Sequence, residues 1–252
     1  MFGTQNSRTE KTPPLVNRVI KFTNNLVSLI YPCSCINCGE LVTGSGDRVP
    51  LCEKCRSVIN YITDDALYKN TDFKNITGFF SLGFYEGVLR NLLTNLKYNK
   101  KTKIVGFLAE ETAKRLCHQF SVPPITEYEL IIPVPLHINK LQERGFNQSE
   151  LLAIDISKIL KIPVACDVVY RVKETLPQNK LKIEERFLNL ENAFKINDKK
   201  KYLISDKNVI IIDDILTTGA TVESMAKLLK KIGARNVFVL TISKTNIKRL
   251  NR

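Results

Sequence analysis

Residues 209–221 read Val-Ile-Ile-Ile-Asp-Asp-Ile-Leu-Thr-Thr-Gly-Ala-Thr, an apolar run followed by two carboxylates and a turn rich in hydroxyl groups. The apolar run predicts a strand, which we expect to end at Asp213 and Asp214. The short turn then opens a helix expected from Thr221 to Ile232, and Gly233 follows where helices commonly end. A strand that passes through a tight turn into a helix indicates an α/β domain.

The turn itself suits a dianionic phosphate, because the N–H groups and the positive dipole end of a helix N-terminus favour anions. Gly219 allows close approach of the backbone. Three residues add hydroxyl donors: Thr217, Thr218 and Thr221. Asp213 and Asp214 would repel a phosphate but can accept hydrogen bonds from vicinal hydroxyls, so a sugar with a terminal phosphate fits both halves. The alternative is an ordinary acidic turn. The segment lacks the spaced glycines of P-loops and dinucleotide sites.

Strands and helices alternate on both sides of this segment. Apolar runs predict further strands at 79–84, 129–135, 168–172 and 236–243, and place the central strand at 207–212. Apolar stripes with helical spacing predict helices at 88–96, 105–117 and 149–160, in addition to 221–232. The basic run 198–201 is expected to be a solvated loop. The alternation predicts a parallel or mixed sheet flanked by helices.

The chain divides into four predicted segments. Residues 1–30 form a polar lead-in followed by an amphipathic helix over Leu15–Ile30, and residues 31–60 hold paired cysteines around a glycine-rich turn at Gly44–Asp47. Residues 61–76 are polar and are expected to link this part to a large domain at 77–252.

Two pairs of cysteines have the spacing of metal ligands. Cys35 and Cys38 form one C-x2-C knuckle, Cys52 and Cys55 form the second, and residues 39–51 lie between them. Two such knuckles can place four thiolates about 2.3 Å from one zinc ion, so we predict a structural Zn²⁺ site. Unmetallated thiols are the alternative, and Cys33 is a rival for Cys35. Two other cysteines are expected to be core thiols: Cys117 and Cys166.

The composition is that of a basic globular chain. Hydrophobic residues make up 44% of the 252 residues, enough for one sizeable core and a small second domain. No window approaches the ~20 consecutive apolar residues of a membrane span. Arg18 and Lys21 interrupt the amphipathic N-terminal segment, so we expect no signal peptide and a cytoplasmic location. The formal charge of +13 favours polyanionic partners, or else serves only solubility.

Residues 209–221 resemble the diphosphate-sugar signature of type I phosphoribosyltransferases. Other segments narrow the resemblance to the ComF family of competence-associated proteins, which are ComFC- and GntX-like. These segments are the cysteine ribbon at 35–55, Pro133-Val-Pro-Leu-His137, Arg144-Gly-Phe-Asn-Gln148, and Arg171-Val-Lys-Glu-Thr-Leu-Pro-Gln178 with Arg186 and Asn189. The resemblance covers about residues 30–245. It implies the type I phosphoribosyltransferase fold, a parallel sheet flanked by helices, beside a small N-terminal zinc ribbon.

The resemblance also implies roles for individual residues. Asp213 and Asp214 would be the catalytic pair that binds the ribose hydroxyls. The 5′-phosphate would lie on Thr217, Thr218, Gly219, Ala220 and Thr221. The pyrophosphate, together with Mg²⁺, would meet the loop after the second strand and nearby cations: Leu136, His137, Lys140, Arg144 and Lys173. Relatives commonly carry Arg at positions 140 and 173, and Lys keeps the charge but loses the bidentate fork.

The segment Arg144–Gln148 allows two interpretations: a substrate loop, which we favour, or a turn in which Phe146 fills the core. His137 is given no catalytic role, because it is as well suited to hydrogen-bonding its own loop.

Two functions are compatible with these residues. One is a competence factor that binds phosphoribosyl diphosphate or a related phosphosugar and handles incoming single-stranded DNA, with a competence helicase as a candidate partner. The other is an active phosphoribosyltransferase of nucleotide or other metabolism with no DNA role, and no acceptor motif is legible. A basic stretch suits DNA, although such clusters are commonly just a solvated helix end: Lys97, Lys100, Lys101 and Lys103, with Tyr98 as its one aromatic residue.

Overall fold

The computed structural model describes residues 34–42, 51–63, 73–119, 125–173 and 192–246. Within these ranges, no helix has both the length and the apolar character needed to cross a bilayer. Several expectations lie outside the described residues: the helix over Leu15–Ile30, the turn at Gly44–Asp47, Cys33, Arg186 and Asn189.

The centre of the molecule is a parallel sheet of four strands. The strands are β1 (Gly78–Phe84), β2 (Leu130–Pro133), β5 (Asn208–Leu216) and β6 (Asn236–Lys244), in the order β1-β6-β5-β2. Each neighbouring pair runs in the same direction. Sheets of this kind are buried on both faces, which explains why these strands appear in the sequence as continuous apolar runs.

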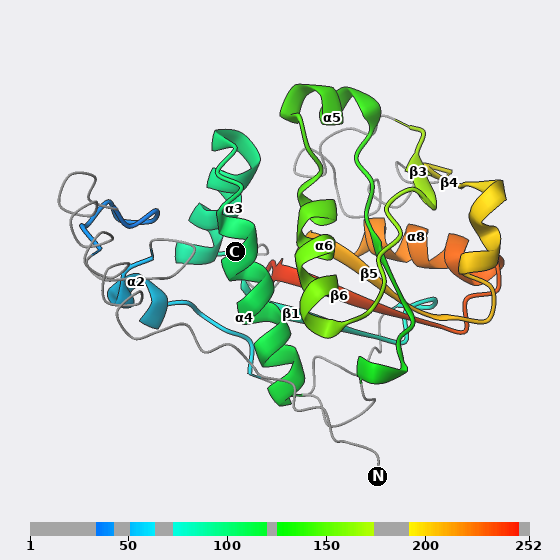
Figure 1. The fold of residues 1–252 in the computed structure, drawn as a ribbon, viewed down its shortest axis with the longest axis horizontal. Coiled ribbons are helices and arrows are strands. Elements are labelled where there is room, and N and C mark those ends of the chain that lie inside the picture. The colour runs from blue at the N-terminus through cyan, green and yellow to red at the C-terminus, as the bar shows by residue number, and fades with distance from the viewer. Residues whose placement is uncertain (1–33, 43–50, 64–72, 120–124, 174–191, 247–252) are drawn as a thin grey trace, which may run out of the picture.

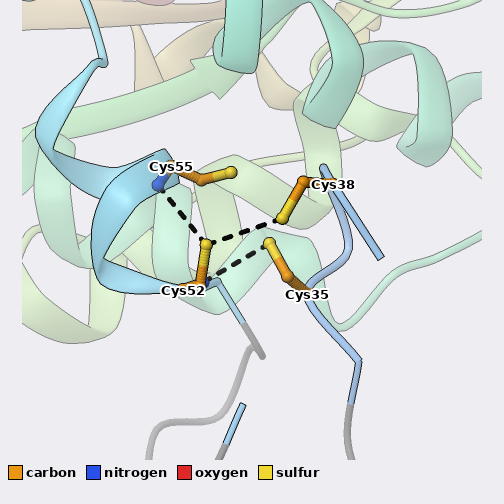
Figure 2. A group of neighbouring side chains, drawn as sticks. All are labelled: Cys35, Cys38, Cys52 and Cys55. Atoms are coloured by element: carbon orange, nitrogen blue, oxygen red, sulfur yellow. Dashed lines mark hydrogen bonds between the residues drawn. The ribbon is translucent and has the colours of Figure 1, made fainter. Parts of the chain in front are cut away.

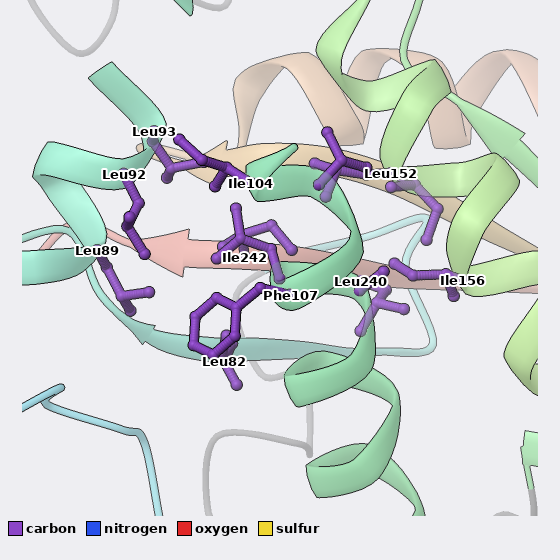
Figure 3. Close-up of a cluster of buried hydrophobic side chains, with 14 of the residues drawn as sticks. Leu82, Leu89, Leu92, Leu93, Ile104, Phe107, Leu152, Ile156, Leu240 and Ile242 are labelled. Atoms are coloured by element: carbon purple, nitrogen blue, oxygen red, sulfur yellow. The ribbon is translucent and has the colours of Figure 1, made fainter. Parts of the chain in front are cut away.

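Helices cover both faces of the sheet (Figure 1). On one face lie α3 (Gly87–Asn99), α4 (Ile104–Gln119) and α6 (Gln148–Leu160), and on the other lies α8 (Ala220–Lys231). The side chains of β5 alternate accordingly: Ile210 and Ile212 join the first cluster, and Val209 and Ile211 join the second. Figure 3 shows the first cluster, in which leucines of α3 and α6 meet Phe107 and the strand residues. Fully burying one such side chain stabilises the fold by about 1.5–3 kcal/mol.

The predicted strands and helices of this domain are confirmed, with four corrections. β5 does not end at the carboxylates but continues through them to Leu216. The expected loop after β2 holds a short helix, α5 (Ile138–Arg144). The run 198–201 is not a loop, because it begins the 3-10 helix η4 (Asp198–Leu203). A further strand, β4 (Phe194–Ile196), pairs antiparallel with β3 (Val169–Arg171).

The cysteine-bearing segment packs against the edge of the large sheet. Its helix α2 (Glu53–Ser57) is flanked by Leu51 and Ile59, which join the same apolar cluster as α3 and α4. Residues 60–62 run beside β1: the Ile62 N–H donates to the Leu82 carbonyl at 3.1 Å, and the Phe84 N–H donates to the Asn60 carbonyl at 3.1 Å. Gly83 permits this approach, since a Cβ there would lie 2.6 Å from the Asn60 oxygen. The first residues of the expected linker are therefore part of the packed structure.

Candidate functional site

Asp213 and Asp214 lie inside β5, near its carboxyl end, and both are withdrawn from solvent. Asp214 is only 4% exposed, and its carboxylate forms an ion pair with Lys97 at the end of α3. Asp213 is half-buried, and its Oδ1 accepts two hydrogen bonds: one from the Ser149 hydroxyl at 3.0 Å and one from the Asp214 N–H at 2.9 Å. A strand that ends in two carboxylates would ordinarily leave them exposed to solvent, but here α3 and α6 reach over the end of β5.

The two carboxylates perturb each other. Burial and the neighbouring charge of Asp214 raise the pKa of Asp213 to about 7, against the opposing influence of the Asp214 N–H, Lys97 and Ser149. Burial alone would lower the pKa of Lys97, but attraction to Asp214 outweighs it and raises the pKa. Burial lowers the pKa of Arg171 in β3, while the charge of Asp213 acts in the opposite direction. The site therefore combines two carboxylates with two partly buried cations.

The turn after β5 presents the N-terminus of α8. Gly219 is the N-cap residue with φ 80°, a left-handed conformation that favours glycine. A Cβ at this position would also overlap the ring of Phe73, which packs directly on Gly219. The segment that carries Phe73 is held to α8, because the side chain of Asn75 donates to Glu223 Oε1 at 2.7 Å.

The hydroxyl of Thr218 is buried, and it has no hydrogen-bond partner among the described residues. A buried hydroxyl without a partner costs free energy unless a ligand or water completes it. Residues 217–221 therefore fit an anion bound at the N-terminus of α8, beside the carboxylates of the preceding strand.

The segment after β2 approaches the same end of the sheet. His137 forms an isolated parallel bridge with Arg171, and its Nδ1 accepts from the Asn139 N–H at 3.4 Å, so it caps α5. This agrees with the view that His137 holds its own segment. Lys140 lies within α5 rather than in a loop, and Lys173 is exposed just beyond β3.

The segment Arg144–Gln148 is a turn between two helices. The Arg144 guanidinium donates to the Gln148 side chain, and Phe146 packs against the core. Asn147 caps α6, and its amide donates to the Val134 carbonyl at 3.0 Å, which fixes the start of α6 and so directs Ser149 toward Asp213. The geometry matches the second interpretation of this segment, and direct contact with substrate stays a prediction.

Lys97 and Ser149 were missed by the sequence analysis. Lys97 extends the apolar stripe of α3, because it follows Leu93 by one helical turn. A lysine on a buried stripe was the available signal, but it was interpreted as part of a surface cluster. Arg171 was named only as part of the family resemblance.

The four paired cysteines form a second site (Figure 2). The Sγ atoms of Cys35, Cys38, Cys52 and Cys55 all lie within 4.8 Å of one another. Two N–H groups point at sulfurs: Cys52 N–H at Cys35 Sγ and Cys55 N–H at Cys52 Sγ, each at 3.4 Å. Four thiols so close together can hold a metal ion, since sulfurs around a tetrahedral ion are separated by slightly under 4 Å.

Cys117 and Cys166, the two expected core thiols, differ in their exposure to solvent. Cys117 is exposed, so that expectation is wrong, because this position lies on the solvent side of α4. Cys166 is half-buried, and burial raises the pKa of its thiol to about 11.

The cysteine site is tied to α3 through Asn37. The Asn37 amide donates to Cys55 Sγ at 3.1 Å, and its oxygen accepts from the Asn91 side chain of α3 at 2.9 Å. The helix that contacts the thiol cluster is thus the helix that delivers Lys97 to Asp214.

Comparison with known proteins gives a consistent picture. A family model described as "Phosphoribosyl transferase domain" matches residues 147–252. Competence protein F of Haemophilus influenzae is 32% identical over 199 residues, which cover 75% of this chain and 82% of the relative. Competence protein ComFC of Bacillus subtilis is 28% identical over 212 residues and covers 82% of both chains. DNA utilization protein YhgH of Escherichia coli K12 is 30% identical over 161 residues, 64% of this chain and 69% of the relative.

Among solved structures, a purine phosphoribosyltransferase from Pyrococcus horikoshii matches 56% of this chain and 82% of its own, with 18% identity and a TM-score of 0.34.

We predict that Gly219→Ala destabilises the protein by about 1–3 kcal/mol, through strain at positive φ and overlap with Phe73. In a Phe73→Ala background only the backbone strain remains, so the same substitution should cost less. Urea denaturation of the four proteins measures both effects. An equal cost in both backgrounds would show that the ring does not restrict residue 219.

The raised pKa of Asp213 makes a prediction about stability and pH. Between the ordinary value of 3.8 and about 7, the folded chain holds a proton on Asp213 that the unfolded chain has released. The free energy of unfolding should therefore fall as pH rises through this window, by at most about 1.4 kcal/mol per pH unit. Asp213→Asn should remove this contribution, and Asp198→Asn in exposed η4 serves as the control. Parallel pH profiles for parent and Asp213→Asn would contradict the prediction.

Proposed function

The chain belongs to the ComF family of competence proteins, and on this premise we propose that it binds 5-phosphoribosyl diphosphate and acts in DNA uptake during natural transformation. One observation carries the ligand assignment. β5, the turn after it and the start of α8 bring together two carboxylates, a helix N-terminus capped by Gly219, and the Thr218 hydroxyl, which has no partner among the described residues. A sugar with vicinal hydroxyls and a terminal phosphate uses all three features.

In this proposal each part of the site has one task. Residues 217–221 bind the 5′-phosphate, and Asp213 and Asp214 accept hydrogen bonds from the ribose hydroxyls. The segment from Leu136 to Lys140 faces the diphosphate, with Arg144 and Lys173 as further cations. Mg²⁺ bound with the diphosphate supplies neutralisation of the charge on the leaving group.

Transfer of the phosphoribosyl group to an acceptor is a second candidate, favoured by the phosphoribosyl transferase domain match over residues 147–252. Pyrophosphate release, assayed across nucleobase and amine acceptors with and without single-stranded DNA, separates turnover from binding alone. Release that is independent of DNA would favour a metabolic enzyme.

The proposed DNA surface is the turn between α3 and α4. Lys100, Lys101 and Lys103 are exposed there, whereas Lys97 is buried and does not belong to the surface cluster. Tyr98 is 73% exposed and is available for stacking on a base. The Lys100 ammonium lies 3.9 Å from where a Cβ on Gly145 would stand, so the basic turn borders the α5–α6 turn.

We propose that the metal in the cysteine site is a structural Zn²⁺, held by Cys35, Cys38, Cys52 and Cys55. Four thiolates in paired knuckles are the donor set that zinc prefers. Unpaired thiols also suit a reducing compartment, which supports a cytoplasmic location. The division into a ribbon at 31–60, a linker at 61–76 and a phosphoribosyltransferase domain at 77–252 is part of this proposal. A competence helicase is a candidate partner by family membership, testable by co-purification from competent cells.

For the sugar-diphosphate site, we expect Asp213→Asn to weaken binding of phosphoribosyl diphosphate with Mg²⁺ by about 1.5–3 kcal/mol, the worth of a charge-assisted hydrogen bond. Asp214→Asn should weaken it too, but it also leaves Lys97 unpaired, so its fold must be checked. Isothermal calorimetry gives the affinities, with Asp198→Asn as the matched control. Unchanged affinity in folded Asp213→Asn protein would remove the pair from the ligand site.

For DNA, we expect binding that depends weakly on sequence and steeply on salt, because each neutralised phosphate contributes about −0.7 to the slope of log K against log[salt]. Reversing Lys100, Lys101 and Lys103 to Glu should lower both the affinity and the slope. The same charge change at exposed Lys114, Lys227 and Lys231 is the control. Absence of binding at low salt would end the direct DNA role. Loss of binding in Asp213→Asn protein would show that the two sites overlap.

For the metal, elemental analysis should find one zinc per chain, and Cys52→Ser should lose it. Because the thiol cluster joins the apolar cluster of α3 and α4, zinc removal should also lower the melting temperature. Cys117→Ser, outside the cluster, should change neither quantity. Full zinc retention in the Cys52→Ser protein would contradict the ligand assignment.

A further inference from the structure

Lys97 and Asp214 form an ion pair that is almost wholly withdrawn from water. The side chain of Lys97 is 16% exposed and that of Asp214 is 6% exposed. The desolvation of two charges is costly, and an apolar pair of similar size is commonly as stable or more stable. Lys97 moreover occupies a place on the buried stripe of α3 where leucines precede it. Stability of the fold is therefore a poor explanation for a lysine at this position.

The pair leaves the two carboxylates in different situations. Asp214 has its charge neutralised by Lys97. Asp213 receives both of its hydrogen bonds on Oδ1, from the Ser149 hydroxyl and the Asp214 N–H, and no donor among the described residues reaches Oδ2. Asp213 Oδ2 is consequently a carboxylate oxygen that a ligand hydroxyl can use.

Two adjacent carboxylates cannot both stay ionised in a buried site without a cation, because like charges at short range drive one of them to take a proton. Four groups face Asp213 from separate elements: Asp214 of β5, Lys97 of α3, Ser149 of α6 and Arg171 of β3. Lys97 itself faces both carboxylates and Tyr85. The ammonium of Lys97 is thus the cation that stands against the two negative charges from the α3 side.

We propose that Lys97 is a positioning residue of the diphosphate-sugar site: its ammonium neutralises Asp214, so that Asp213 can lose its proton near neutral pH and offer Oδ2 to a ribose hydroxyl. The inference rests on the proposed function, in which the two carboxylates meet the ribose. The inference gives α3 an influence on ligand affinity, although α3 lies outside the unit formed by β5, the turn at residues 217–221 and α8. Lys97 acts through the carboxylates and does not touch the ligand in this role.

The test compares Lys97→Met, which keeps an unbranched stem without the charge, and Lys97→Arg, which keeps the charge. Lys114→Met, at an exposed lysine of α4, is the control. Affinity for phosphoribosyl diphosphate with Mg²⁺ is measured by calorimetry from pH 6 to 9, with the folded fraction checked by circular dichroism. The pH midpoint of the affinity reports the ionisation of the carboxylate pair.

We expect Lys97→Met to bind at least about fivefold more weakly at pH 7, to recover as pH rises, and to show a midpoint at least about one pH unit higher. Lys97→Arg should return the midpoint toward that of the parent, which a merely space-filling role would not produce. Equal affinity and equal midpoint in parent and Lys97→Met would overturn the inference. If the parent protein itself does not bind, the proposed function fails instead, and the two failures are distinguishable.

If Lys97→Met does not fold, the double variant Lys97→Met with Asp214→Asn leaves no unpaired buried charge and takes its place. With the repulsion of Asp214 also removed, Asp213 should ionise at or below the midpoint of the parent. A midpoint above that of the parent in the double variant would show that Lys97 acts on Asp213 directly and not by neutralising Asp214, which would contradict the proposed role.

Discussion

Asp214 can be buried inside a strand only because Lys97 reaches it from a helix far earlier in the chain. For that contact, α3 must lie across the carboxyl end of the sheet, and its leucines hold it there against β6 and α4. The same helix meets the thiol cluster through Asn91 and Asn37. The apolar packing of α3 thus brings Lys97 to Asp214, and the same helix contacts the cysteine segment.

Much of the fold is legible in the sequence because a parallel sheet buried on both faces leaves a strong signal. The runs that became β1, β5 and β6 are rich in apolar residues and are buried at most positions, so their strands could be predicted. The short elements could not be. Helix α5 has no buried residue and hence no apolar stripe, and it exists because His137 caps its start and Gly145 ends it. Helix η4 likewise has no buried residue, and Asn197 caps its start.

Part of the candidate site could likewise be predicted from contiguous residues, and part depends on residues that are distant in the sequence. The carboxylates and the turn at residues 217–221 are contiguous, so their chemistry can be inferred from sequence alone. Lys97 and Ser149 come from α3 and α6, and their importance depends on contacts with β5 that no local pattern contains. The mistaken end of β5 has the same origin, since a charged residue in a strand signals an exposed end unless its partner is known. The cysteine cluster is again local in origin, because paired knuckles define the donors before any fold is known.

Lys97 also affects the electrostatic potential where the basic turn between α3 and α4 lies near the two carboxylates. Lys100, Lys101 and Lys103 are exposed beside the α5–α6 turn, at the same end of α3 that carries Lys97. At physiological ionic strength charges act over about 8 Å, so two uncompensated carboxylates near this turn would repel a passing polyanion. With Lys97 against Asp214 and Arg171 near Asp213, the local charge of the pair is largely balanced. Under the proposed function, the basic turn attracts nucleic acid while the recessed carboxylates accept hydrogen bonds from a sugar.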